Sequence, residues 1–206
     1  MKTIHNLIIL DASGSMASKA PEVIGGINKI IDDLKSDELS NPEAKNLTTI
    51  VDFSSHTDFT VIYDKTATQD LKLIDNTQYS ARGMTALYDA IGKASMLIPK
   101  GSTDVMVTIF TDGLENDSKE YKQTSIKALI ESKEELGWVI TYMGTSHEAM
   151  LQASEIGLTE DKVLRYSNSK EGTSYAMDSI MLARKKYTIS KMQGKDVDDI
   201  FDKKNS

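Results

Sequence analysis

Residues 6–16 read Asn6-Leu7-Ile8-Ile9-Leu10-Asp11-Ala12-Ser13-Gly14-Ser15-Met16, an apolar run that ends in an acid, two hydroxyls and a glycine. The apolar run is typical of a strand that is buried on both faces of a sheet. In an open α/β sheet, ligands bind at the carboxyl ends of the strands. The oxygens of Asp11, Ser13 and Ser15 suit a small hard cation there. Serine and aspartate are also common helix N-caps, so this motif alone leaves a plain cap and turn open.

Apolar strand patterns alternate with amphipathic helix patterns along the rest of the chain. Five polar residues, 54–58, separate two strand patterns and favour a hairpin with one antiparallel strand at the sheet edge. The alternation predicts an α/β fold: a doubly wound, mostly parallel, Rossmann-like sheet with helices on both faces. The expected strands are 3–10, 47–53, 59–63, 104–110, 138–143 and 162–165, and the expected helices are 16–35, 85–97, 118–135, 147–156 and 171–190, with loops at 36–46 and 66–80.

Composition sets limits on the function. The chain has 206 residues, no cysteine and a formal net charge of −7, which argues against nucleic-acid binding by charge neutralisation. It lacks both an apolar run of the ~20 residues that span a bilayer and a signal-peptide pattern. We therefore expect a cytoplasmic protein that does not bind membranes. We assign 1–192 to a single domain and 193–206 to a charged tail, in which Val197, Ile200 and Phe201 could dock.

Two further segments are expected to meet the Asp11 loop. Parallel strands place their strand-to-helix loops on one edge of the sheet, so Asp112, which follows strand 104–110, should share the edge of Asp11. Thr85 stands at the start of helix 85–97, where unpaired N–H groups favour negative charge. It can reach the same place. Oxygens from three separate loops are therefore expected to converge.

Three motifs together resemble the von Willebrand factor type A domain over about residues 3–190. They are Asp11-Ala12-Ser13-Gly14-Ser15-Met16, Gly83-Met84-Thr85-Ala86-Leu87-Tyr88-Asp89-Ala90-Ile91 and Phe110-Thr111-Asp112-Gly113. That family carries a metal-ion-dependent adhesion site on the carboxyl edge of its sheet. The resemblance implies that the Ser13 and Ser15 hydroxyls bind the ion directly, that Asp11 and Asp112 hold it largely through waters, and that Thr85 joins in the high-affinity form.

The same resemblance implies a function. The ion would be Mg²⁺ or sometimes Mn²⁺, and its open position would accept a Glu or Asp side chain of a partner protein. We expect a non-enzymatic protein-binding module of the intracellular bacterial or phage type. In the family, partner binding is coupled to displacement of the C-terminal helix, here 171–190. Many relatives have a second glycine where this chain has Met84, which affects the shape of the loop but no ligand.

Two alternatives stay open: a Mg²⁺-dependent phosphohydrolase, and a structural scaffold of the same fold whose partner contacts do not use the metal. The sequence has no phosphate-cradling glycine loop and no G-x-S-x-G elbow. Glu115 and Asp117 are interpreted as exposed acids at a helix start. Ser146 is interpreted as the N-cap of helix 147–156. His56 and His147 are interpreted as ordinary exposed residues, and adjacent Ser-His pairs are no evidence of a catalytic triad.

Overall fold

The computed structural model describes residues 2–40, 43–195, 197 and 200–201. Within these residues six strands form one sheet in the order β3-β2-β1-β4-β5-β6. The strands are β1 (Lys2–Asp11), β2 (Ala44–Phe53), β3 (Phe59–Ala67), β4 (Val105–Phe110), β5 (Val139–Gly144) and β6 (Val163–Arg165). The α-helices are α1 (Ala20–Ser40), α2 (Leu87–Leu97), α3 (Gln123–Glu135), α4 (His147–Glu155) and α5 (Lys170–Met192). Short 3-10 turns are η1 (Gly14–Lys19), η2 (Thr68–Asp70) and η3 (Glu160–Lys162).

The strand pairing confirms the predicted fold class. β1 is parallel to both β2 and β4, and β5 and β6 continue the parallel arrangement. β3 is antiparallel to β2 and lies at the edge, as the hairpin pattern predicts. Leu10 pairs with Phe110, so β1 and β4 end side by side and deliver Asp11 and Asp112 to the same edge of the sheet.

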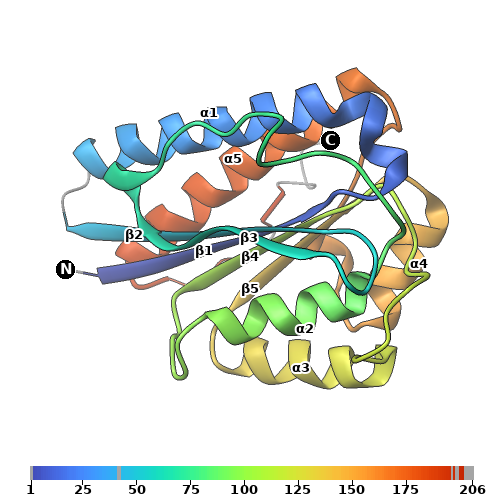
Figure 1. Cartoon of the computed structure of the whole chain (residues 1–206). Coiled ribbons are helices and arrows are strands. Elements are labelled where there is room, and N and C mark those ends of the chain that lie inside the picture. The colour runs from blue at the N-terminus through green and yellow to red at the C-terminus, as the bar shows by residue number, and fades with distance from the viewer. Residues whose placement is uncertain (1, 41–42, 196, 198–199, 202–206) are drawn as a thin grey trace.

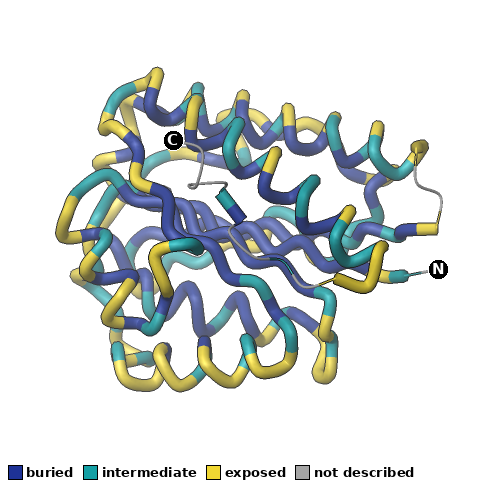
Figure 2. Tube along the Cα trace, turned by 180° about the vertical axis from the view of Figure 1, so that it is seen from behind, coloured by how far each residue is buried: buried dark blue, intermediate teal, exposed yellow. Residues whose placement is uncertain are grey.

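Helices cover both faces of the sheet (Figure 1). α1 and α5 lie on one face, where Ile27 and Ile180 pack with Ile8 of β1. α2 and α3 lie on the other, where Ile91 and Ile126 belong to a second apolar core. The strands are mostly buried except for the edge strand β3, whose residues are intermediate or exposed, while each helix alternates between buried and exposed positions (Figure 2). This pattern is the 3.6-residue periodicity by which the helices were predicted.

Two helix bounds differ from the prediction by five residues, the end of α1 and the start of α3. α1 follows the 3-10 turn η1 and continues to Ser40, and β2 begins at Ala44, so the expected loop 36–46 is wrong over 36–40 and 44–46. The apolar periodicity stops at Leu34, and the last turn is polar apart from Leu39, which is 86% exposed, so nothing in the hydrophobic pattern marks it. α3 begins at Gln123 rather than 118, because acidic side chains hold the preceding residues as a loop, as described below.

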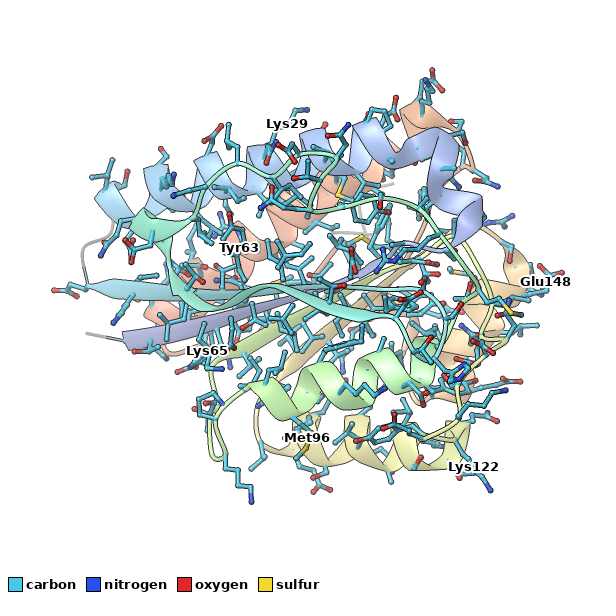
Figure 3. The ribbon with its side chains drawn as sticks, viewed as in Figure 1. Lys29, Tyr63, Lys65, Met96, Lys122 and Glu148 are labelled. Carbon is cyan, nitrogen blue, oxygen red and sulfur yellow. The ribbon has the colours of Figure 1, made fainter. Side chains whose placement is uncertain are left out.

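Lys29 of α1, Lys122 directly before α3 and Glu148 of α4 are exposed on the outside of the molecule (Figure 3). No helix among the described residues is long and apolar enough to cross a membrane. Beyond α5, Ile200 is 3% exposed and packs in a small apolar cluster with Ile4 and Tyr187. The other residues of the predicted tail lie partly outside the described ranges.

Candidate metal site

The loop after β1 is held in shape from within. Asp11 is fully buried, and its Oδ1 accepts a 2.7 Å hydrogen bond from the backbone N–H of Ser13. The N–H of Gly14 donates to the carbonyl oxygen of Gly83 at 3.2 Å, which joins this loop to the segment that carries Thr85. Ser13 occupies the N-cap position of the 3-10 turn η1, but its side chain makes no capping hydrogen bond. The Asp-x-Ser-x-Ser motif therefore does not act as a simple helix cap.

Hydroxyl and carboxylate oxygens from the β1 and β4 loops meet. Ser13 Oγ lies 3.1 Å from Ser15 Oγ, and Ser15 Oγ donates to Asp112 Oδ1 at 2.6 Å. From the β4 side, the hydroxyl of Thr111 donates to Asp11 Oδ2 at 2.5 Å. Asp11, Ser13, Ser15 and Asp112 thus form one connected cluster.

Thr85 reaches the same cluster through the surroundings of Gly113. A Cβ placed on Gly113 would lie 3.2 Å from Thr85 Oγ1 and 3.7 Å from Asp11 Oδ2, so the two oxygens border the same small space. Thr85 is only 4% exposed and stands two residues before α2, which begins at Leu87 rather than at the predicted 85. The structure therefore brings all five predicted site residues together.

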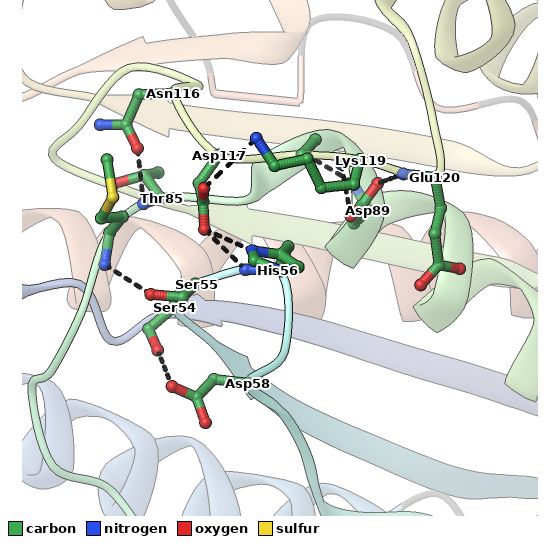
Figure 4. A network of polar contacts seen from close by, with 12 residues as sticks. Ser54, Ser55, His56, Asp58, Thr85, Asp89, Asn116, Asp117, Lys119 and Glu120 are labelled. Atoms are coloured by element: carbon green, nitrogen blue, oxygen red, sulfur yellow. Dashed lines mark hydrogen bonds and ion pairs between the residues drawn. The ribbon is translucent and has the colours of Figure 1, made fainter.

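Hydrogen bonds between loops fix the position of Thr85 (Figure 4). The N–H of Thr85 donates to Asn116 Oδ1, and the N–H of Asn116 donates to the Thr85 carbonyl oxygen, both at 2.9 Å. The N–H of Met84 donates to Ser55 Oγ at 3.1 Å. Next to it, His56 binds Asp117 Oδ2 at 2.9 Å through its backbone N–H and through Nδ1 (Figure 4). The hairpin tip, the Thr85 loop and the loop after β4 form one braced rim.

The interpretation of Glu115 and Asp117 as exposed acids at a helix start is wrong, because α3 begins only at Gln123 and the Asp117 side chain is 12% exposed beside His56. Glu115 also lies in the loop before α3. Its carboxylate accepts hydrogen bonds from the N–H groups of Tyr88, Asp117 and Ser118. Buried Asp89 of α2 similarly accepts the N–H groups of 119, 120 and 121. Side chains that satisfy successive backbone N–H groups compete with helix formation. These two acids hold 115–121 as a loop, which is why α3 starts at Gln123.

Two tyrosines support the site from below. The hydroxyl of Tyr79 donates to the carbonyl oxygen of Asp11 at 2.6 Å, and that of Tyr166 donates to the carbonyl oxygen of Thr111 at 3.1 Å. The Tyr166 ring stacks on Phe110 with centroids 5.2 Å apart. Sequence patterns did not identify these residues, because Tyr79 lies in an irregular segment and Tyr166 follows the shortest strand.

The buried carboxylates set the electrostatics. Burial raises the pKa of Asp11 to about 6, and the hydrogen bonds from Thr111 and Ser13 offset only part of this effect. The Asp112 side chain is 1% exposed, and its Oδ2 forms an ion pair with the ammonium of Lys19, which is 4% exposed. Lys19 also donates to Oδ1 of Asn168, in the segment between β6 and α5. Lysine is rarely buried, so nothing in the sequence pointed to Lys19.

The donor set fits a hard cation. Three hydroxyls and two carboxylates supply only oxygen ligands, which Mg²⁺ prefers over the nitrogen and sulfur donors of zinc sites. Among the described residues, no group of three or more His, Cys, Asp or Glu side chains is placed to hold a metal. A metal here would therefore depend on Ser13, Ser15 and Thr85 as much as on the two acids.

The remaining residues singled out from the sequence lie apart from this cluster. Ser146 is the N-cap of α4, and its Oγ accepts a 3.0 Å hydrogen bond from the N–H of Ala149, as predicted. His147 is exposed in the first turn of that helix.

Comparisons with known proteins agree with this architecture. The model of the von Willebrand factor type A domain family matches residues 7–180. A search of curated proteins found no match. Among solved structures, the pilus adhesin SpaC from Lactobacillus rhamnosus GG is 12% identical with a TM-score of 0.67, over 88% of this chain and 30% of SpaC.

Two other solved structures are similar. Proximal thread matrix protein 1 from the mussel byssus is 19% identical with a TM-score of 0.62, over 87% of this chain and 45% of that protein. The vWF domain of the type V pili tip protein Mfa5 from Porphyromonas gingivalis is 10% identical with a TM-score of 0.63, over 89% of this chain and 95% of that domain. At such identities the likeness concerns the fold, and this chain spans less than half of the SpaC and mussel proteins.

Proposed function

Because the chain belongs to the von Willebrand factor type A domain family, a family of protein-interaction modules, we propose that it binds one Mg²⁺ at the oxygen cluster and uses it to capture a Glu or Asp side chain of a partner protein. The hydroxyls of Ser13, Ser15 and Thr85 are the proposed direct ligands. Asp11 and Asp112 are the proposed outer acids. Mn²⁺ is expected to substitute for Mg²⁺.

One observation supports the proposal: five oxygen-bearing side chains from three loops lie in one cluster of short contacts. Ser15 Oγ contacts both Ser13 Oγ and Asp112 Oδ1, at 3.1 and 2.6 Å, and the space beside Gly113 adjoins Thr85 and Asp11. Burying hydroxyls and carboxylates costs free energy of folding unless their charge and hydrogen-bonding capacity are compensated. A bound cation would supply part of this compensation in the largely buried cluster. The bound cation would supply a positive charge for an incoming carboxylate.

The rim around the cluster also bears on the partner. Met84 and Leu114, which neighbour Thr85 and Gly113, are 49% and 42% exposed. Their loops are tied together by the hydrogen bonds between Thr85 and Asn116. An acidic residue flanked by an apolar side chain would match this rim, because the apolar neighbour would bury Met84 and Leu114 while the carboxylate reaches the cation.

Metal binding is the first step to test, by thermal denaturation with and without millimolar MgCl₂ or MnCl₂. A ligand that binds only the folded state raises its stability by RT ln(1 + [L]/Kd). We expect the melting temperature of the wild type to rise and that of the double variant Ser13→Ala, Ser15→Ala to stay unchanged. No rise for the wild type would contradict the proposal and favour a scaffold that does not use a metal.

Partner capture is the second step. Immobilised wild type should retain a host protein in Mg²⁺ and release it in EDTA, while Asp11→Ala should retain none. Lys29→Met is the control, because its ammonium is exposed on α1 and pairs with Asp178 rather than with a residue of the cluster. Metal-dependent turnover of a phosphate ester that is lost in Asp112→Ala would instead support a phosphohydrolase.

A further inference from the structure

A lysine occupies one side of the candidate metal site. Lys19 is the last residue of the turn η1, eight positions after Asp11, and its side chain is 4% exposed. Its ammonium pairs with Asp112 Oδ2, while Asp112 Oδ1 accepts the hydroxyl of Ser15. Both oxygens of this acid are therefore engaged by groups of the chain itself.

Burial of this ammonium needs a reason beyond packing. A charged side chain that leaves water loses hydration, and only a close counter-charge with further hydrogen bonds compensates that loss. Lys19 has both: the Asp112 carboxylate and the side-chain carbonyl oxygen of Asn168. The nearby Arg82 does not take part, because it pairs with Asp52 at 2.8 Å. Lys19 is thus the cation that balances Asp112.

The charge of the cluster changes accordingly. Asp11, Asp112 and Lys19 together carry a single net negative charge when both acids are ionised. Without Lys19 the two acids would balance a divalent cation fully. With Lys19 present, a divalent cation leaves one positive charge in excess, and like charges at close range repel strongly where water is partly excluded. A carboxylate from outside would remove this excess.

We propose that Lys19 is an internal counter-ion that weakens divalent metal binding by the free protein, so that the cation and an external carboxylate bind cooperatively. This inference rests on the proposed function, because it concerns the same site. Such coupling is reciprocal: the factor by which a bound carboxylate raises the metal affinity equals the factor by which bound metal raises the carboxylate affinity. The Lys19–Asp112 ion pair would then persist until the divalent cation and the external carboxylate are both present.

The test compares Mn²⁺ titrations of the wild type, Lys19→Met and Asn168→Ala by calorimetry, with Lys29→Met as the control for loss of a lysine charge. Each titration is repeated with sodium acetate in place of sodium chloride at equal ionic strength. Urea unfolding without metal gives the stability of each protein. Asn168→Ala is included because it removes one partner of Lys19 and keeps every charge.

We expect Lys19→Met to bind Mn²⁺ about tenfold more tightly than the wild type, because the repulsion is gone, and to be less stable without metal, because buried Asp112 loses its counter-charge. Asn168→Ala should tighten binding by about threefold, as the loss of one hydrogen bond implies. Acetate should strengthen Mn²⁺ binding in the wild type more than in Lys19→Met. A lysine with only a structural role would instead lower both stability and metal affinity when removed.

Equal Mn²⁺ affinity of the wild type and Lys19→Met, or weaker binding by Lys19→Met, overturns the role of Lys19 and leaves the proposed metal site intact. A Lys19→Met protein that folds only when Mn²⁺ is added supports the role. Absence of Mn²⁺ binding in the wild type and in all three variants overturns this inference together with the metal site.

Discussion

Thr85 and Asn116 hold each other by two reciprocal hydrogen bonds of 2.9 Å, one from each backbone N–H. The first joins the Thr85 N–H to the Asn116 side chain, and the second joins the Asn116 N–H to the Thr85 carbonyl oxygen. The pair connects the loop before α2 with the loop after β4 (Figure 4). Thr85 is a proposed metal ligand and Asn116 is not, so the position of a proposed ligand depends on a residue outside the ligand set.

Asn116→Ala removes the side-chain half of this pair. We expect a loss of about 1 kcal/mol in the free energy of unfolding, the usual effect of one hydrogen bond, and weaker Mn²⁺ binding because Thr85 is less well positioned. Urea unfolding and calorimetry measure the two effects. Asn76→Ala, at an exposed position elsewhere, should change neither. Unchanged Mn²⁺ affinity in Asn116→Ala would show that Asn116 does not position Thr85 for metal binding.

Gly113→Ala tests the space between Thr85 and Asp11. The added methyl would lie 3.2 Å from Thr85 Oγ1 and 3.7 Å from Asp11 Oδ2, so it would take part of the volume that a cation or its waters need. We expect Mn²⁺ affinity to fall by about tenfold or more, with a change in stability within about 1 kcal/mol. Gly25→Ala is the matched control, since nothing lies within 4 Å of its added methyl. Normal Mn²⁺ binding by Gly113→Ala would show that the cation lies elsewhere.

Asp11→Asn tests the electrostatics of the metal-free protein. Burial raises the pKa of Asp11 from 3.8 to about 6, so the folded state favours its protonated form. The stability from this group is fully present below pH 3.8 and is lost as the pH rises through about 6. At pH 7 the ionised carboxylate therefore costs up to about 3 kcal/mol.

We accordingly expect metal-free Asp11→Asn to be more stable than the wild type at pH 7, with a difference that shrinks toward pH 4. Chemical denaturation in EDTA at several pH values measures it. Asp32→Asn, at an exposed position of α1, provides the same charge change without burial. A wild type that is the more stable protein at pH 7 would mean that Asp11 is held by stronger partners than Thr111 and Ser13.

The central strands β1 and β4 were predictable from the sequence because they are buried on both faces. Ile4 and Leu7–Leu10 are at most 3% exposed, and such runs stand out without knowledge of any contact. The parallel order then followed from the alternation of elements, and with it the shared edge of Asp11 and Asp112. The N-cap Ser146 was also predictable, because a serine directly before a helical pattern is a local signal.

Features that depend on contacts distant in the chain were not predictable. Asp89 lies 30 residues before the Lys119 N–H that it accepts, and this contact moves the start of the expected helix 118–135 to Gln123. Lys19 meets Asn168 across 149 residues, so its burial has no signature in its own neighbourhood. Sequence motifs identified the residues expected to bind a cation. Only the structure identified the residues that hold them in place, such as Asn116, and the lysine that pairs with Asp112.

The most direct test of the metal site is a crystal structure of the protein grown with MnCl₂, with anomalous diffraction recorded to locate manganese. The account predicts one anomalous peak about 2.1 Å from both Ser13 Oγ and Ser15 Oγ, on the side that faces Thr85 and Asp112. A structure with no peak at these oxygens, or with manganese only at other positions, would contradict it.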